Sequence, residues 1–269
     1  SGVTLGINRS KSMKYLNDVS YKDCVGKVCK SKSSGDFKIL KYNNARNVVI
    51  QFLKTCYETT VKLTNIKSGI IKDPYSPSVC SVGIVGTKYL STINDVKTKE
   101  YMLWQNMLER CYSDTYKKKN PTYINCEVSD KFKSYEYFYE WCCNQIGFGV
   151  EGFELDKDLL VKGNKVYSEN TSIFLPKEIN SMLTKCTASR GKHLIGVYWS
   201  ATNKAFVARV NKNKGGSEWL GSFNTEVEAF NAYKKAKESF VKELANKWKG
   251  QIDERAYNAL MNYTVEITD

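Results

Sequence analysis

Carboxylate and amide side chains gather in one short stretch, residues 155–170 (LDKDLLVKGNKVYSEN). Asp156 and Asp158, with Asn164 or Asn170, offer the oxygen ligands that Mg²⁺ prefers. A metal held there could stabilise a phosphate and activate a water molecule for hydrolysis. That chemistry also needs a general base, most often a histidine, and the only histidine of the chain, His193, lies outside the stretch. The residues therefore suggest a metal site without an evident base.

Lys157 stands between the two aspartates. A protonated lysine would compete with a metal ion for these carboxylates, so a second interpretation is a turn in which Lys157 supplies the counter-charge. We favour the turn, and expect no catalytic residues, no cofactor and no bound metal. If the chain is nevertheless a nuclease, Mg²⁺ and Asp156, Asp158, Asn164 and Asn170 are the expected set. His193 is interpreted as a surface or interdomain residue.

Two helices are expected to precede this stretch. Apolar residues recur at helical spacing in EYMLWQNMLERCY and in SYEYFYEWCCNQIGFG, and the second pattern stops at Gly147, a predicted helix C-cap. Aromatic stripes of this kind are core far more often than stacking platforms, so we expect both to be buried.

A separate pattern covers residues 192–248. HLIGVYWS, AFVARVNK and SEWLGSF predict three short strands, and a long helix follows, with Thr225 and Glu228 as a capping box. Val227, Phe230, Ala236, Phe240, Leu244 and Trp248 are expected on its buried face. Residues 190–249 carry twelve basic and five acidic residues, a net charge of +7.

The N-terminal third of the chain shows no long helical pattern. Residues 1–35 lack apolar periodicity and predict a basic arm or a loosely ordered strand pair that can extend onto a partner. Residues 36–90 contain two β-branched, aromatic runs around a polar turn and predict a small β unit, for which we expect no chemistry. The chain as a whole is predicted to be α+β and built of small units: a basic arm (1–35), a β unit (36–90), a ββα block with aromatic helices (91–185), a three-stranded sheet with a helix (190–250) and a C-terminal tail (251–269).

The ordered motifs of residues 98–183 resemble phage HNH-type homing-endonuclease-like proteins. That resemblance implies a ββα-metal fold and places the family's base in the region of Asp156 or Lys157, so the catalytic motif is degraded here. The matching positions are Arg110, Cys111, Tyr112, Leu155, Asp156, Asp158, Gly163, Asn164, Tyr167, Ser168, Asn170, Phe174 and Pro176.

Residues 194–248 resemble the AP2-type DNA-binding domain. The residues that carry the likeness are Gly196, Val197, Trp199, the 205–210 strand, residues 220–223, and Ala229, Ala232, Tyr233 and Ala236. The resemblance implies that the sheet enters the major groove and presents basic and aromatic side chains. The nucleic-acid-binding or partner-binding residues that it implies are Trp199, Lys204, Arg209, Lys212 and Trp219.

Net charge, cysteine usage and hydropathy indicate the kind of partner and the compartment of the protein. Forty-one Lys and Arg against 28 Asp and Glu give a net charge of +13, which favours polyanionic partners, although a solvated lysine-rich surface is an equal alternative. The nine cysteines include no Cys-x-x-Cys pair and are interpreted as reduced thiols, with an intermolecular disulfide as the minor alternative. No apolar run could span a bilayer and no signal-peptide pattern opens the chain, so we expect the host bacterial cytoplasm and no membrane partner.

Two classes of function follow. The first is a non-catalytic phage binding protein, specifically an anti-defence inhibitor that wraps a host nuclease defence complex and blocks its access to DNA, possible as a homo-oligomer. The size and layout of the chain resemble those of phage anti-Gabija proteins, a likeness of layout rather than of motif. The alternative is a DNA-binding HNH/AP2 homing endonuclease or a phage DNA-binding regulator.

Overall fold

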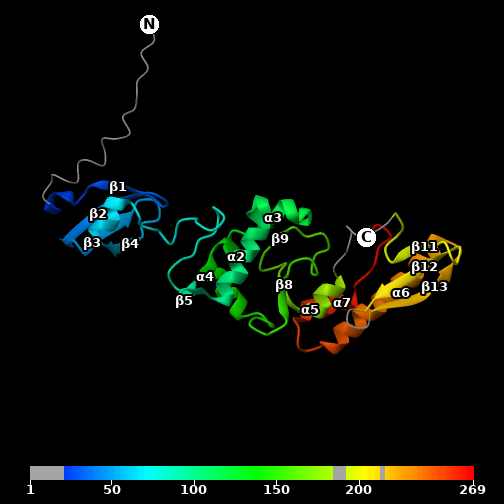
Figure 1. Cartoon of the computed structure of the whole chain (residues 1–269). Coiled ribbons are helices and arrows are strands. Elements are labelled where there is room, and N and C mark those ends of the chain that lie inside the picture. Colours follow the sequence, from blue (N-terminus) through cyan, green and yellow to red (C-terminus); the bar gives the residue numbers. More distant parts are fainter. Residues whose placement is uncertain (1–20, 184–191, 213–215) are drawn as a thin grey trace, which may run out of the picture. The chain divides into compact units, whose positions relative to one another are not determined.

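A computed structural model describes residues 21–183, 192–212 and 216–269, and the chain divides into two compact units (Figure 1). The first unit comprises residues 1–98 with 134–136, and the second comprises residues 99–133 with 137–269. The chain contains helices and several small sheets, which confirms the predicted α+β class. Residues 1–20 of the predicted arm lie outside the described part of the chain.

The first unit is built on an antiparallel meander of four strands in the order β1-β2-β3-β4. Alternation puts Phe37, Ile39, Val48, Ile50 and Phe52 on one face, where they are fully buried against the helix α1. Within residues 1–35, β1 pairs with the start of β2, so this part is strand and not a free arm, in line with the strand-pair alternative. The elements are η2 (Tyr21–Cys24), β1 (Val28–Ser31), β2 (Gly35–Asn44), β3 (Asn47–Phe52), β4 (Glu58–Val61) and α1 (Leu63–Ser68).

A buried aspartate ties the loops of this unit together. Asp73 accepts hydrogen bonds from the hydroxyls of Thr55 and Ser76, and its backbone N–H donates to the Ser34 hydroxyl. The segment that follows is rich in turns, and its named strands are the short hairpin of β5 (Thr92–Ile93) and β6 (Val96–Lys97).

The second unit begins with helices around an aromatic core. Trp104, Phe132 and Phe138 are almost fully buried, and the Trp104 indole donates to the Phe132 carbonyl at 2.8 Å. Both expected stripes therefore lie mainly in the core. The elements are α2 (Lys99–Tyr112), α3 (Asp114–Lys119), η3 (Pro121–Tyr123), β7 (Glu127–Val128), η4 (Lys131–Lys133) and α4 (Tyr135–Cys143).

A ββα arrangement and a three-stranded sheet complete this unit (Figure 1). The strands β8 (Phe153–Asp156) and β10 (Ile173–Pro176) pair antiparallel and lead into α5 (Lys177–Leu183), while β9 (Val166–Tyr167) pairs with β7. The sheet β11 (Val197–Ser200), β12 (Ala205–Asn211) and β13 (Ser217–Phe223) packs on α6 (Glu226–Lys247), and α7 (Glu254–Met261) follows. The two parts share a core, since Ile179 and Met182 of α5 pack with Val241 and Ala245 of α6.

Three local expectations were wrong. The helix α4 ends at Cys143, so Gly147 is not its cap; a Cβ at Gly147 would lie 2.3 Å from the Phe153 ring, which explains the glycine by close packing instead. Ile146, expected in the stripe, is 53% exposed because it follows the end of the helix. Val227 is 52% exposed, and Ala229 and Tyr233 take buried places on α6.

Two other expectations concern membrane-spanning helices and the state of the cysteines. No helix in the described part of the chain combines the length and apolarity needed to cross a membrane. The eight described cysteines are free thiols. Burial raises the pKa of Cys111 to about 12, which keeps that thiol protonated and unreactive.

Candidate nucleic-acid interface and the adjoining hairpin

Asp156 ends β8 and organises the turn that follows. One oxygen of its carboxylate accepts the backbone N–H of Asp158 at 3.0 Å and that of Leu159 at 2.9 Å. Burial is the main cause that raises the pKa of Asp156, the charge of Asp158 adds to it, and these two N–H donors oppose it. The carboxylate therefore acts as a cap for the backbone.

Lys157 takes the centre of the loop. Its side chain is 6% exposed, and its ammonium lies 2.6 Å from the Asp158 carboxylate and 3.3 Å from the Asn164 carbonyl. The rings of Tyr123 and Tyr167 have their centroids 5.9 and 5.6 Å from the same nitrogen. Two aromatic faces, a carboxylate and a carbonyl thus surround this cation.

The two asparagines differ in their roles. The amide of Asn164 donates to the carbonyls of Lys157 and Val166 at 2.7 Å each, and its oxygen accepts the Val166 N–H. Its side chain is therefore committed to closing the loop. Asn170 is exposed in the turn before β10. Within the described ranges, no group of three His, Cys, Asp or Glu side chains could hold a metal ion.

A hollow of about 580 Å³ lies beside the hairpin. Asp156, Asp158 and Asn180 line one part of it, and Asn180 donates to Glu154 at 2.8 Å. Ala259 of α7 and Tyr263 just after it line another part. The C-terminal segment thus borders the place where the sequence suggested a metal-dependent site.

The sheet β11-β12-β13 presents a different chemistry on the face turned away from α6. Alternation directs Val197, Ala208 and Val210 into the core against α6, so Tyr198 and Arg209 point the other way. The Arg209 guanidinium lies 6.0 Å from the centroid of the Tyr198 ring, and Trp219 stands directly opposite Arg209 in the strand register.

These three side chains form a row across three strands, which we call the outer row: Tyr198, Arg209 and Trp219. Tyr198 is 42% exposed and Trp219 is 57% exposed, and Arg209 is also exposed. A bulge between Ala208 and Arg209 brings Arg209 into register with Trp219. A cation between two exposed aromatic side chains on a flat sheet is suited to contact with phosphates and base edges.

No family model, curated protein or solved structure matches this chain.

The other three residues of the predicted binding set, Trp199, Lys204 and Lys212, lie outside the outer row. Trp199 alternates with Tyr198 and packs edge-on against Phe206 with ring centroids 4.9 Å apart, although it is still 47% exposed. Lys204 is exposed in the turn before β12. Lys212 forms an ion pair with Glu218 at 2.5 Å and lies 3.7 Å from the centroid of the Phe240 ring, so it is held within the domain.

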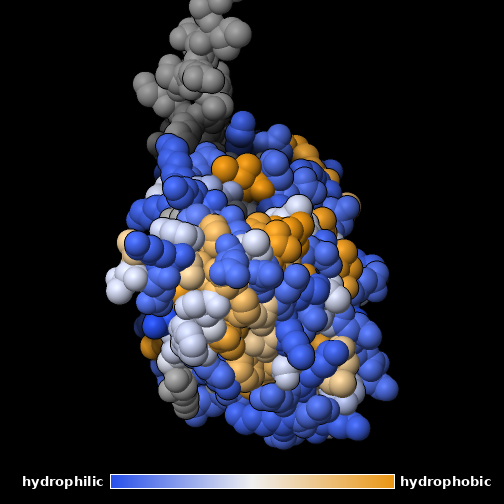
Figure 2. Space-filling model, turned by 90° about the vertical axis from the view of Figure 1, so that its right-hand side faces the viewer, coloured by the Kyte–Doolittle hydropathy of each residue, from blue (hydrophilic) through white to orange (hydrophobic). Residues whose placement is uncertain are grey.

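Tyr198 was missed in the sequence. Its signal is the alternation in GVYWS: once Val197 is assigned to the core, its neighbour must face outward. His193 is half-buried, where it contacts Glu226 at 3.3 Å and packs against Phe206. Figure 2 faces the side of the molecule on which this sheet lies in Figure 1 and shows hydrophobic side chains in its middle, among hydrophilic ones.

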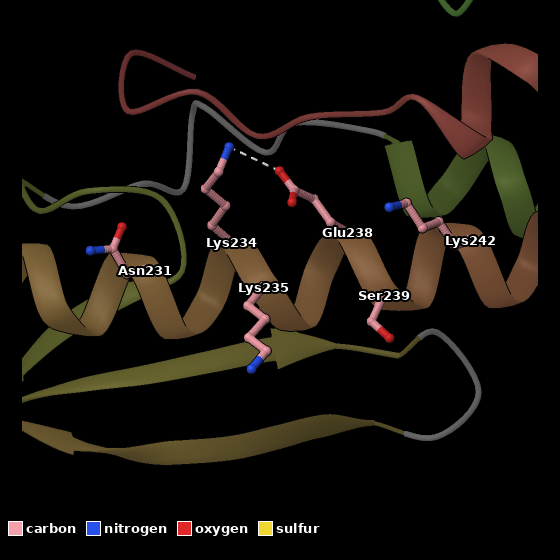
Figure 3. Close-up of a pocket in the computed structure, with 6 residues that line it drawn as sticks. All are labelled: Asn231, Lys234, Lys235, Glu238, Ser239 and Lys242. Atoms are coloured by element: carbon pink, nitrogen blue, oxygen red, sulfur yellow. Dashed lines mark ion pairs between the residues drawn. The ribbon is translucent and has the colours of Figure 1, made fainter.

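A basic hollow of about 420 Å³ lies along α6 (Figure 3). Lys234 of this hollow pairs with Glu238 at 2.9 Å and donates to the Val265 carbonyl, while Glu238 accepts the Val265 N–H. Burial opposes ionisation of Glu238, but these partners hold the pKa of its carboxyl below the usual range. This pair therefore anchors the C-terminal segment, and we assign the hollow no ligand.

Proposed function

We propose that this protein binds double-stranded DNA through the outer row of β11-β12-β13 and does not cut it. The observation that carries the proposal is the placement of Arg209 between Tyr198 and Trp219 on an exposed face. The guanidinium can form two parallel hydrogen bonds to a guanine edge or a phosphate. The two rings supply contact area at low entropic cost, because each has only two side-chain torsions. The net charge of +13 would add long-range attraction to DNA.

The loop beside β8 supports the non-catalytic part of the proposal. Asp156 is engaged with backbone N–H groups, and Asn164 is engaged with backbone carbonyls. Lys157 lies in the region where the HNH resemblance places the family's base, and its ammonium is already bound to Asp158. A metal ion bound by Asp158 or by the engaged oxygen of Asp156 would compete with these contacts.

Equilibrium binding to a fluorescent DNA duplex tests the proposal. Replacing Arg209 by Gln or Trp219 by Ala should weaken binding by about 5- to 150-fold, since a good base contact is worth about 1–3 kcal/mol. The matched control is Lys212→Gln, directly after β12, where the lysine is already paired with Glu218. Arg209 and Trp219 variants that bind as tightly as the unsubstituted protein would refute the assignment of the surface.

A plasmid-cleavage assay tests the proposal that the protein does not cut DNA. We expect no cleavage in Mg²⁺ or Mn²⁺. Metal-dependent cleavage that disappears in Asp156→Ala would show that the protein is an enzyme.

A further inference from the structure

The positive charge of the chain is unevenly distributed. Residues 21–98 contain thirteen basic and five acidic residues, a net charge of +8, whereas residues 99–269 contain 25 basic and 22 acidic residues, a net charge of +3. Residues 21–98, which include the β unit for which the sequence predicted no chemistry, therefore carry most of the excess. A concentration of charge on one face or edge of a domain is the usual electrostatic footprint of a polyanion-binding surface.

One end of the sheet in this unit has no acidic residues. Residues 37–57 and 59–72 contain no Asp or Glu. Asp36 and Glu58 lie toward the end of the sheet that holds the β1-β2 turn, since Asp36 pairs with Lys30 and Glu58 pairs with Gln51. The opposite end, formed by the β2-β3 turn and the start of α1, is free of acidic residues in the sequence.

Three cations meet at that end. Lys41 is on β2, Arg46 is in the β2-β3 turn, and the Leu63 N–H donates to the Ala45 carbonyl at 2.9 Å, which brings Lys62 beside the turn. We call these residues, with Asn43, Asn44 and Asn47 of the same turn, the hairpin end; all six are exposed.

The cations of the hairpin end have no internal counter-charge. Lys41, Arg46 and Lys62 form no ion pair with any residue that the structure describes. In the second unit, by contrast, exposed lysines such as Lys131 and Lys247 pair with Glu169 and Glu178. Unpaired cations beside asparagine amides form a surface that donates many hydrogen bonds, which suits the oxygens of phosphate groups.

We propose that the hairpin end is a second DNA-binding surface, one that contacts the phosphate backbone and not the bases. This inference rests on the proposed function for its partner, duplex DNA, but on a separate set of residues. Two contact regions on one chain raise the effective concentration of the second once the first is bound. A backbone contact adds affinity for any sequence, while the outer row supplies the choice of sequence.

The test is the salt dependence of binding of the full chain to a duplex, measured by fluorescence anisotropy between about 50 and 200 mM salt. Each phosphate contact contributes about 0.9 to the slope of log K against log salt. The triple variant Lys41→Gln, Arg46→Gln, Lys62→Gln should therefore lower the slope by about 2–3. The single variant Arg46→Gln, which alters only an exposed turn, should lower it by about 1.

The matched control is Lys131→Gln, Lys133→Gln, Lys247→Gln. It changes the net charge equally but removes lysines that are already ion-paired, so its slope should fall by less than about 1. Equal slopes for the hairpin-end variant and this control would overturn the inference and leave general charge, or a protein partner of the β unit, as the explanation.

The outer-row variants separate this inference from the proposed function. Weak binding by Arg209→Gln with an unchanged slope in the hairpin-end variant supports the proposed function and refutes the inference. Normal binding by Arg209→Gln with a reduced slope in the hairpin-end variant does the reverse.

Discussion

Replacing Asp156 tests whether its carboxylate caps a turn or serves as a metal ligand. The Asp156→Ala variant leaves the N–H groups of Asp158 and Leu159 without their acceptor. Each such hydrogen bond contributes about 0.5–1.5 kcal/mol net, and the loss is partly offset because a desolvated charge is also removed. We therefore expect Asp156→Ala to lower the free energy of unfolding by about 1–2 kcal/mol. Asp156→Asn keeps an acceptor oxygen and should stay within about 0.5 kcal/mol of the unsubstituted protein.

The pH dependence provides an independent check. Burial raises the pKa of Asp156 above its usual 3.8, so the folded protein prefers the protonated carboxyl more than the unfolded chain does. Its contribution to stability is then greatest below pH 3.8 and is lost as the pH rises through the higher pKa of the folded state. Asparagine does not titrate. The stability of Asp156→Asn relative to the unsubstituted protein should therefore increase as the pH rises from about 4 to 7.

Urea denaturation followed by tryptophan fluorescence is the suitable assay. All five tryptophans lie in residues 99–269, so the signal reports on the unit that contains Asp156. The capping role would be refuted if Asp156→Asn were as unstable as Asp156→Ala. It would also be refuted if Mg²⁺ stabilised the unsubstituted protein but not Asp156→Asn, because only a metal ligand predicts that result.

Substitutions at Gly86 and at Thr225 test a close packing contact and a helix N-cap. Gly86→Ala would place a Cβ 2.2 Å from the Glu136 side chain at a φ of +74°, so we expect lost hydrogen-exchange protection in residues 87–88 and a cost of about 1–3 kcal/mol; Gly149→Ala, with a φ of +73° and no atom within 4 Å, should show only the smaller cost of backbone strain. Thr225→Ala should destabilise α6 by about 1 kcal/mol in urea denaturation, because the Glu228 N–H loses its acceptor, while Thr225→Ser should restore most of that loss.

Much of the fold could be predicted because local patterns and tertiary packing agree. The capping box at Thr225 and Glu228 is present, and α6 begins at the next residue. The strands of 47–61 and 197–223 also appear where β-branched and aromatic runs predicted them. Boundaries were less accurate where a tertiary contact decides them. Gly147 is one case, since its place is set by the ring of Phe153, a contact that no local pattern contains.

The candidate site was predictable only in part. The residue types were visible, but which face each occupies depends on the strand register, and the bulge at Ala208 and Arg209 alters that register. Lys212 could not be distinguished from Arg209 in the sequence, because only the structure brings Glu218 and Phe240 to it. The host defence complex, the homo-oligomer and the cytoplasmic location stay predictions.

The loop after β8 is held in shape by hydrogen bonds and an ion pair among its own side chains. Two carboxylates close together repel, and such a site ordinarily relies on a cation to hold them. Here the ammonium of Lys157 lies 2.6 Å from Asp158 and also donates to the Asn164 carbonyl, so the counter-charge is part of the chain. Asn164 in turn donates to the Lys157 carbonyl, which makes the two residues mutually dependent. The counter-charge and the hydrogen bonds that shape this loop therefore come from residues of the loop itself.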